Sequence, residues 1–282
     1  MAGVLNELST RALVNAIEAN LFAFLPLWRR WPAAAIHDGP DLLWSLTGFP
    51  IPLFNSVMRA NLARDEVEAA IASVVARGRS RDVPILWWTG PATRPADLGE
   101  RLTAGGFVHV EDAPGMAADL RDVRDPRELP DGLPPAPGLV VEQVADLATL
   151  REWCAAMCAG YEMPAAFGET YYDCLINLGL EAQAPLRHYL GRLEGEPVAS
   201  ATLFLGAGVA GIYDVSTIPA ARRRGIGAVM TVHPLQDARA DGYRIGILHS
   251  SAAGLAMYRR LGFGQYCSIG QYLWANEQEG RG

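Results

Sequence analysis

The chain has 282 residues, half of them hydrophobic, and a formal net charge of −7 at pH 7. From length alone we expect about two domains, each large enough to bury a core of its own. The negative charge argues against nucleic acid as the main partner, because binding to a phosphate backbone requires clustered positive charge, and it mildly favours a cationic substrate such as an amine.

The cysteines and the hydropathy of the chain indicate its compartment. Cys154 and Cys158 share a helical face, but no second pair has metal-ligand spacing, so we expect buried thiols in a reducing compartment and no metal site. No apolar run reaches the roughly 18 residues of a membrane span. Glu7 and Glu18 stand where a signal peptide would have a basic start and an unbroken apolar core. The sequence therefore predicts a cytoplasmic protein without a membrane segment.

The first 120 residues alternate between helical and extended patterns. An amphipathic helix is expected at the start and should end before Pro26. Residues 41–48 and 84–88 are apolar runs typical of strands, and residues 65–77 have one apolar face at helical spacing. A second helical pattern over residues 98–107 ends in a Gly-Gly-Phe sequence.

A linker is predicted at residues 121–138, which are rich in Pro, Asp and Arg. Such a composition cannot build a core and favours a semi-extended chain. We expect residues 115–120 to complete a first sheet before this linker. The predicted domains are therefore residues 1–120 and 139–282.

The second half begins with a short strand and two helices. The strand is expected at residues 139–141, and Asp146 is placed to cap the first helix. Residues 161–178 should form a loop and a second helix, broken near Pro164 and Gly168.

Three further strands follow, joined by hairpin turns that contain glycine. After them come a glycine-rich turn, a long helical pattern, a short strand, a short helix and a last strand. The predicted strands cover residues 186–193, 198–205, 209–216, 244–249 and 265–274. This gives the order β-α-α-β-β-β-α-β-α-β.

The segment most informative about function is Arg222-Arg-Arg-Gly-Ile-Gly227, called here the glycine turn. Gly225 and Gly227 let the backbone approach a ligand closely, and the first amides of the following helix point outward at the positive end of its dipole. Such a place binds phosphate, and the arginines add charge-assisted donors. The turn lacks the Lys-Ser/Thr ending of a P-loop and the third glycine of a dinucleotide fingerprint. Taken alone, it is also compatible with a tight connection that binds nothing.

The glycine turn follows a strand that ends in Val-x-Thr-x-Pro, at Val215, Thr217 and Pro219, and precedes Tyr258-x-x-Leu-Gly-Phe263. This ordered set resembles the acetyl-CoA-binding core of the GNAT superfamily of N-acetyltransferases. The resemblance implies an α/β (α+β) fold whose mixed, mostly antiparallel sheet is flanked by helices, with a central parallel pair of strands around one helix.

The same resemblance, which covers residues 139–274, implies an acetyl-CoA-dependent N-acetyltransferase. The acetyl group would move from the CoA thioester to a primary amine of a small molecule or peptide, by direct attack in a ternary complex. Acetyl-CoA or another acyl-CoA would be the cosubstrate, and no metal is implied. The alternative is a non-catalytic acyl-CoA-binding or interaction protein. Acceptor and oligomeric state are left open.

Cofactor-binding residues are assigned by the resemblance. The backbone of Val215, Ser216 and Thr217 would hydrogen-bond the pantetheine arm as an added strand does. The glycine turn and the residue after it would take the pyrophosphate, with Arg222 contributing charge and loop shape. The predicted contacts there are Arg222, Arg223, Arg224, Gly225, Ile226, Gly227 and Ala228.

The catalytic acid implied by the resemblance is Tyr258, for which a buried core tyrosine is the plain alternative. Ser251 stands where the family usually has Asn. A serine there can cap a helix that starts at Ala252, which puts its contact with the cofactor in doubt.

The general base is not determined. Asp214 is the only carboxylate in the strand before the glycine turn, but a register error of one residue would reverse the side that it faces. Glu162, Glu169 and His188 are further candidates, and a water-mediated base or an amine that arrives neutral would need none of them.

An internal repeat is predicted because both halves show the same order of elements. Aligning Phe107 on Phe263 gives an offset of 263 − 107 = 156, which places Tyr258 on Leu102, a residue with no proton to give. The glycine turn then falls near residues 62–71, which contain three acidic residues and no glycine. The first half is therefore predicted to be a degenerate GNAT-like repeat without a cofactor site, although unrelated α/β units can also share this order.

Overall fold

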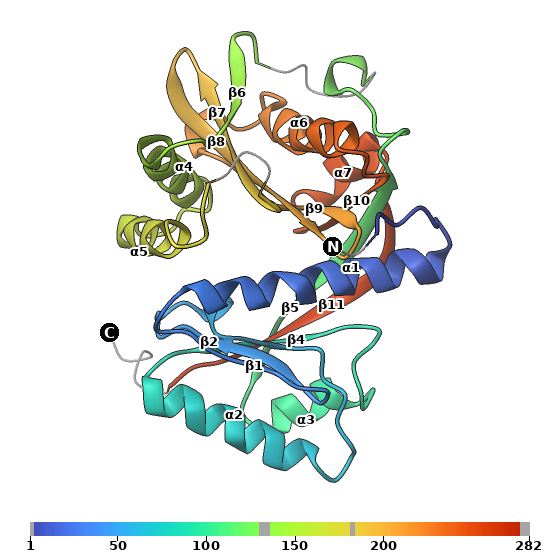
Figure 1. The fold of residues 1–282 in the computed structure, drawn as a ribbon, viewed down its shortest axis with the longest axis vertical. Coiled ribbons are helices and arrows are strands. Elements are labelled where there is room, and N and C mark those ends of the chain that lie inside the picture. The colour runs from blue at the N-terminus through green and yellow to red at the C-terminus, as the bar shows by residue number, and fades with distance from the viewer. Residues whose placement is uncertain (1–2, 130–135, 181–183, 277–282) are drawn as a thin grey trace. The chain divides into compact units, whose positions relative to one another are not determined.

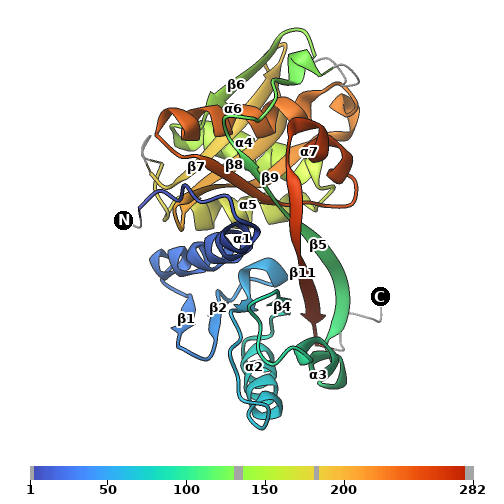
Figure 2. The same ribbon diagram turned by 90° about the vertical axis from the view of Figure 1, so that its right-hand side faces the viewer.

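Residues 3–129, 136–180 and 184–276 are described by the structure, a computed structural model (Figures 1 and 2). The chain divides into two units, each treated by itself below. Unit 1 comprises Met1–Asn20 and Gly115–Tyr266, and unit 2 comprises Leu21–Pro114 and Cys267–Gly282. In the described part of the chain, no helix is long and apolar enough to cross a membrane.

Unit 1 contains a mixed sheet whose early strands are antiparallel. Consecutive strands pair in chain order, and the last two of these antiparallel pairs are hairpins whose tight turns are allowed by positive φ angles at Gly195 and Gly208. The next pairing is parallel, because α6 (Ile226–Ala240) carries the chain back before β10 (Ile245–His249). The antiparallel strands are β6 (Leu139–Gln143), β7 (Leu186–Leu193), β8 (Glu196–Gly206) and β9 (Val209–Thr217).

Helices cover both faces of this sheet (Figure 1). One face is covered by α4 (Leu147–Gly160) and α5 (Ala165–Leu175), and the other by α6 with α7 (Leu255–Leu261) beside it. As predicted, the Asp146 side chain caps α4, accepting a hydrogen bond from the Thr149 amide at 2.8 Å. The predicted break at Gly168 is wrong: α5 runs through this residue, which is buried against Cys158 Sγ.

Unit 2 repeats the order of elements seen from β7 onward in unit 1. The short strands β1, β2 and β3 pair antiparallel, and β3 is parallel to β4 across α2. A short helix, α3, then leads to β5. The elements are β1 (Ala35–Asp38), β2 (Leu43–Leu46), β3 (Ser56–Met58), α2 (Val67–Arg81), β4 (Ile85–Thr89), α3 (Leu98–Ala104) and β5 (Val108–Asp119). The prediction of tandem GNAT-like sheets flanked by helices is confirmed. The sequence did not predict β1 and β3, which are too short to show a pattern.

The last strand of each half of the chain pairs with a strand of the other half. In unit 1, Gly115 to Asp119 of β5 pair antiparallel with β10. In unit 2, Gly270 to Trp274 of β11 (Gly264–Trp274) pair antiparallel with β4. The expectation that residues 115–120 complete the first sheet is therefore wrong, because a strand pattern shows which side chains are buried and not which edge supplies the hydrogen bonds.

The predicted domain boundaries, 1–120 and 139–282 around a linker at 121–138, remain a prediction. In the structure, both units contain chain segments from either side of this linker.

We expect Trp274→Ala to destabilise unit 2, although this residue comes after every predicted site residue in the sequence. Trp274 is buried in the same core as Ile85 and Trp87, and losing its indole should cost about 3–5 kcal/mol. Denaturant unfolding measures the loss, and hydrogen exchange locates it in β2 to β4 rather than β7 to β9. Trp274→Phe should lose less. Faster hydrogen exchange confined to β7–β10 would contradict the pairing of β11 with β4 in unit 2.

Candidate active site

The two parallel strands of unit 1 stop pairing before β9 ends. The last pair in the register is Leu248 with Ile212, whereas β9 continues to Thr217. A β-bulge in β9 begins there: Tyr213 lies opposite Thr202 and Ser216 opposite Ser200, so two residues of β9 oppose one of β8. Such a bulge bends a strand and increases its twist. β10 ends at His249, so residues 214–217 form, on the side away from β8, an edge with which no strand of the described residues pairs, called here the open edge of β9.

The glycine turn connects this edge to α6. Arg223 and Gly225 have φ angles of 62° and 68°, in the left-handed region that glycine adopts without strain. The backbone N–H groups of residues 223–228 donate no hydrogen bond to any described residue. They lie together at the positive end of a 15-residue helix. These amides fit an anion such as a diphosphate.

Space for a ligand beside these amides is indicated by Gly227. A Cβ atom built on Gly227 would meet nothing closer than Met257 Sδ, at 3.5 Å, which is ordinary contact. The packing of the protein itself therefore does not require glycine at this position. A ligand close to the backbone would require it.

The three arginines of the glycine turn differ in their contacts. Arg222 donates from Nε to the Thr217 carbonyl at 3.1 Å and from Nη2 to the Gly160 carbonyl at 2.8 Å, and its Nη1 lies 3.5 Å from Glu162. Arg222 thus joins the end of β9 to the end of α4 and fixes the shape of the turn. Arg223 and Arg224 are exposed and make no ion pair with any described residue. The latter two charges are available to an anion.

Tyr258 lies on α7 and is 8% exposed. Burial raises the pKa of its phenol to about 12, against a smaller opposite effect of a hydrogen bond with Thr231. The hydroxyl is therefore protonated at neutral pH and able to donate. Thr231 also donates to the Gly227 carbonyl at 2.9 Å. Tyr258 is thereby linked to the glycine turn through α6.

The sequence did not identify Gly254, one helical turn before Tyr258. A Cβ atom at Gly254 would lie 2.8 Å from Cε2 of Tyr258, so glycine makes room for the phenol ring. Ser251 is exposed, and its hydroxyl accepts a hydrogen bond from the Gly254 amide at 3.3 Å. The helix begins at Leu255, so the predicted start at Ala252 is wrong: residues 251–254 form a turn first.

Asp214 and His188, both predicted as candidate bases, belong to one buried hydrogen-bond network. Thr202 donates to Asp214 at 2.8 Å, and Tyr171 approaches the same oxygen at 3.5 Å. Because the Thr202 hydroxyl donates its proton to Asp214, it accepts from Nδ1–H of His188, 2.9 Å away. Burial raises the pKa of Asp214, and it lowers the pKa of His188 to about 3.

The other two candidate bases lie at the surface. Glu162 is exposed beside Arg222, and Glu169 is exposed with Arg151 Nε 3.8 Å away. The structure therefore brings Asp214 and His188 together and leaves both glutamates outside their network.

The corresponding turn of unit 2 has its amides occupied by the protein itself. The segment before α2 contains no glycine, and the Glu66 carboxylate accepts a hydrogen bond from the Ala63 amide at 3.2 Å. Arg59 donates to Asp38 and to the Gly39 carbonyl, both at 2.7 Å. An acidic side chain thus stands where unit 1 has open amides, and the absence of a pyrophosphate site from the first repeat remains a prediction.

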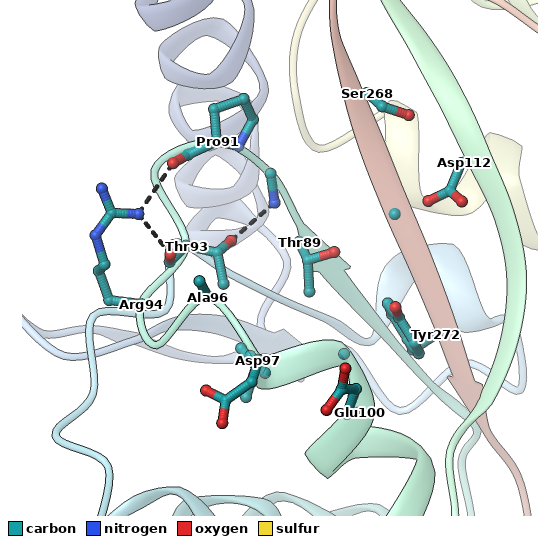
Figure 3. A pocket seen from close by; sticks show the side chains of 14 residues that line it. Thr89, Pro91, Thr93, Arg94, Ala96, Asp97, Glu100, Asp112, Ser268 and Tyr272 are labelled. Atoms are coloured by element: carbon teal, nitrogen blue, oxygen red, sulfur yellow. Dashed lines mark hydrogen bonds between the residues drawn. The ribbon is translucent and has the colours of Figure 1, made fainter.

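Unit 2 also contains a cavity of about 500 Å³ between the end of β4, the start of α3, and β5 and β11 (Figure 3). Thr89, Glu100, Asp112 and Tyr272 are among the side chains that line it. No predicted site residue does so. The cavity is therefore separate from the residues assigned to acetyl-CoA.

The cysteines are free thiols. Cys154, Cys158 and Cys174 are buried, and Cys267 is partly buried. Among the described residues, no cluster of His, Cys, Asp or Glu side chains could hold a metal ion.

We expect Asp214→Asn to stabilise the fold at neutral pH. Burial raises the pKa of Asp214, so the wild type loses stability as the pH rises from the ordinary range of an aspartate, about 4, through the raised value. Asparagine removes the charge and keeps an acceptor for Thr202. The gain in denaturation midpoint should vanish as the pH falls below about 4, where the carboxyl is protonated in both states. Asp173→Asn, at an exposed position on α5, is the control; an Asp214→Asn variant less stable than wild type at neutral pH would contradict this reading.

Comparisons with known proteins agree with this geometry. Residues 149–263 match the Acetyltransferase (GNAT) family, while the chain matches no curated protein sequence. Among solved structures, a GCN5-related N-acetyltransferase from Kribbella flavida is similar with a TM-score of 0.69 and 19% identity, over 92% of this chain and 96% of that chain.

Two further structures are similar over most of the chain. A GCN5-related N-acetyltransferase from Sphaerobacter thermophilus has a TM-score of 0.57 and 15% identity, over 97% of this chain and 95% of that chain. A tandem GNAT protein from the clavulanic acid biosynthesis pathway has a TM-score of 0.55 and 16% identity, over 86% of this chain and 83% of that chain. At these identities the likeness shows the fold. Together with the family match, it identifies residues 149–263 as a GNAT acetyltransferase domain, of a family that transfers an acyl group from acetyl-CoA.

Proposed function

We propose that this chain is an N-acetyltransferase that moves the acetyl group of acetyl-CoA to a primary amine, by direct attack in a ternary complex. One observation carries the proposal. The amides of residues 223–228 have no partner among the described residues, and they directly follow an open strand edge. A diphosphate and an extended amide-containing arm are the ligands that such a pair of features would bind.

Acetyl-CoA would be held mainly by backbone groups. Its diphosphate would accept hydrogen bonds from the amides of the glycine turn and of Ala228, with Arg223 and Arg224 adding charge-assisted contacts. Its pantetheine arm would lie along Val215 to Thr217 of the open edge. Arg222 would act through the shape of the turn, since its guanidinium already bonds to two carbonyl groups of the protein.

The chemistry requires a neutral amine and a stabilised thiolate leaving group. Tyr258 would donate its proton to the departing thiolate, because burial keeps the phenol protonated. The acceptor would be a small molecule or peptide with a primary amine, and the net charge of −7 favours the approach of a cation. We also propose a cytoplasmic location and a reaction that needs no metal.

Turnover with amines tests the proposal against the alternative of a non-catalytic acyl-CoA-binding protein. The purified chain would be incubated with acetyl-CoA and a broad panel of primary amines, and release of free thiol would be followed. Amine-dependent release supports the enzyme. Tight binding of acetyl-CoA with no release over the panel favours the binding protein.

We expect Gly227→Glu to abolish the binding of acetyl-CoA in calorimetry. The new carboxylate would stand beside the amides of residues 223–228 and repel the diphosphate, whereas the fold should tolerate it because the position has space. Gly227→Ala is the matched control, with a smaller loss of affinity and an unchanged Tm. An unchanged affinity in the glutamate variant would count heavily against the assignment of the turn.

Tyr258→Phe should lower kcat by at least about 100-fold, the usual contribution of general acid catalysis, while the Kd for acetyl-CoA changes little. Phenylalanine keeps the ring in its place beside Gly254 and removes only the hydroxyl. Tyr243→Phe, at a partly buried position after α6, controls for the loss of a tyrosine hydroxyl elsewhere. If kcat and affinity fell equally, the role of Tyr258 as the acid would be lost.

A further inference from the structure

His249, the last residue of β10, is partly buried, and its two ring nitrogens are buried without a hydrogen-bond partner among the described residues. A buried polar group without a partner is unfavourable and rare in native proteins, and it calls for an explanation such as a ligand or a catalytic role. The other histidine of the unit 1 sheet, His188, is buried and has Thr202 as its partner. In the described part of the chain, the other buried side-chain atoms without a partner belong to Trp31, Trp87 and Asp97, all in unit 2.

The position of His249 is the point at which β9 and β10 stop pairing. Leu248 and Ile212 form the last pair in the register, so His249 is level with Tyr213. The two rings are adjacent, with centroids 6.2 Å apart. Tyr213 donates its hydroxyl hydrogen to Asn20 at 2.7 Å and so gives nothing to the imidazole. His249 thus stands directly beside the start of the open edge of β9.

His249 and Tyr258 belong to opposite faces of the sheet. Leu248 lies in the core beneath α6, and a Cβ atom on Gly246 would meet Leu235 of the same helix. Since side chains alternate along a strand, His249 points to the other face. Tyr258 contacts Thr231 on the α6 side. An acyl group held at the open edge would therefore have a proton donor on one side and an unpartnered imidazole on the other.

We propose that His249 is the general base of the acetyl transfer and takes the proton that the acceptor amine loses. This inference rests on the proposed N-acetyltransferase function. It adds the identity of the general base, which the proposed function leaves open. Asp214 is less suited to the role because Thr202 already donates to it from within the protein.

The proton and electron balance of the step is complete. The lone pair of the amine forms the N–C bond at the thioester carbonyl carbon, and the carbonyl π pair moves to oxygen. A proton on the amine nitrogen passes to His249, the oxygen pair returns, and the C–S bond breaks. The thiolate takes the proton of Tyr258. Solvent then accepts the proton of His249 and restores that of Tyr258, so that the net products are the amide and the free thiol.

Burial lowers the pKa of His249 to about 4, so the ring is unprotonated at neutral pH and has a free nitrogen lone pair. Such a weak base cannot deprotonate a free ammonium group efficiently. It can accept the proton once the N–C bond forms, since the attacking nitrogen is then strongly acidic. The acceptor, which approaches as a cation, would accordingly lose a proton to solvent before it attacks as the neutral amine.

The first test compares two substitutions with the amine that gives the highest turnover in the panel. We expect His249→Gln, which keeps a donor and an acceptor but cannot take a proton, to lower kcat by at least about 100-fold with an acetyl-CoA Kd within about threefold of wild type. His249→Phe should lose as much kcat and gain in Tm, because it removes the buried unpaired nitrogens. His233→Gln, on α6 against the ring of Tyr189, is the control and should keep its kcat. A His249→Gln variant with wild-type kcat overturns the proposal.

The second test needs no acceptor and separates this proposal from the function on which it rests. Imidazole signals of histidine-labelled protein would be followed during titration with acetyl-CoA, with the His249 signal assigned from the His249→Gln variant. We expect acetyl-CoA to shift that signal and to leave in place the signals of two histidines of unit 2, the partly buried His37 and the exposed His109. Binding of acetyl-CoA without a shift at His249 overturns the base assignment alone. Failure of acetyl-CoA to bind at all overturns the proposed function and this inference together.

Discussion

The start of α6 is the constraint on which the rest of unit 1 depends. A helix N-terminus leaves amides without intrahelical partners, and here Gly225 begins the helix with no side chain to cap it. The protein instead fixes the turn from both sides. Arg222 joins it to β9 and α4, and Thr231 bonds back to the Gly227 carbonyl from one turn along the helix. These contacts hold the amides in position without using them, so they stay available to an anion.

The bulge in β9 supplies the second half of the arrangement. β10 ends at His249, level with Tyr213, and at the same point two residues of β9 opposite one of β8 bend β9 and increase its twist. The same bend explains why Asp214 points to the face that carries Thr202 and His188, which the alternation of side chains alone could not decide. The bulge and the end of β10 together leave backbone groups of β9 unpaired on one side, and His249 lies beside the point where the two strands part.

The features predicted from the sequence are those that local chemistry determines. Gly225, Gly227 and the arginines predict a turn with open amides, because the effects of glycine and of charge on backbone conformation and anion binding extend over only a few residues. The position of the last strands was not predictable in this way: residues 115–120 have the same apolar character whether they pair with β10 or with a strand of their own half. His249 was missed for a related reason. His249 stands out because its ring nitrogens lack hydrogen-bond partners, and a sequence does not show which groups surround a side chain.

The two repeats share an order of elements but differ at the positions of the predicted site. The Phe107 amide bonds to the Leu102 carbonyl at 3.0 Å, and the Phe263 amide bonds to the Tyr258 carbonyl at the same distance, so Leu102 and Tyr258 occupy equivalent places. Both are buried core positions. A leucine satisfies such a place by its shape alone, whereas a tyrosine hydroxyl there needs a polar partner, which Thr231 provides. The packing of the short helix therefore does not require the phenol. A tyrosine at this place in unit 1 agrees with the proposed role of Tyr258 as the acid, whereas in unit 2 the Glu66 carboxylate accepts from an amide of the corresponding turn.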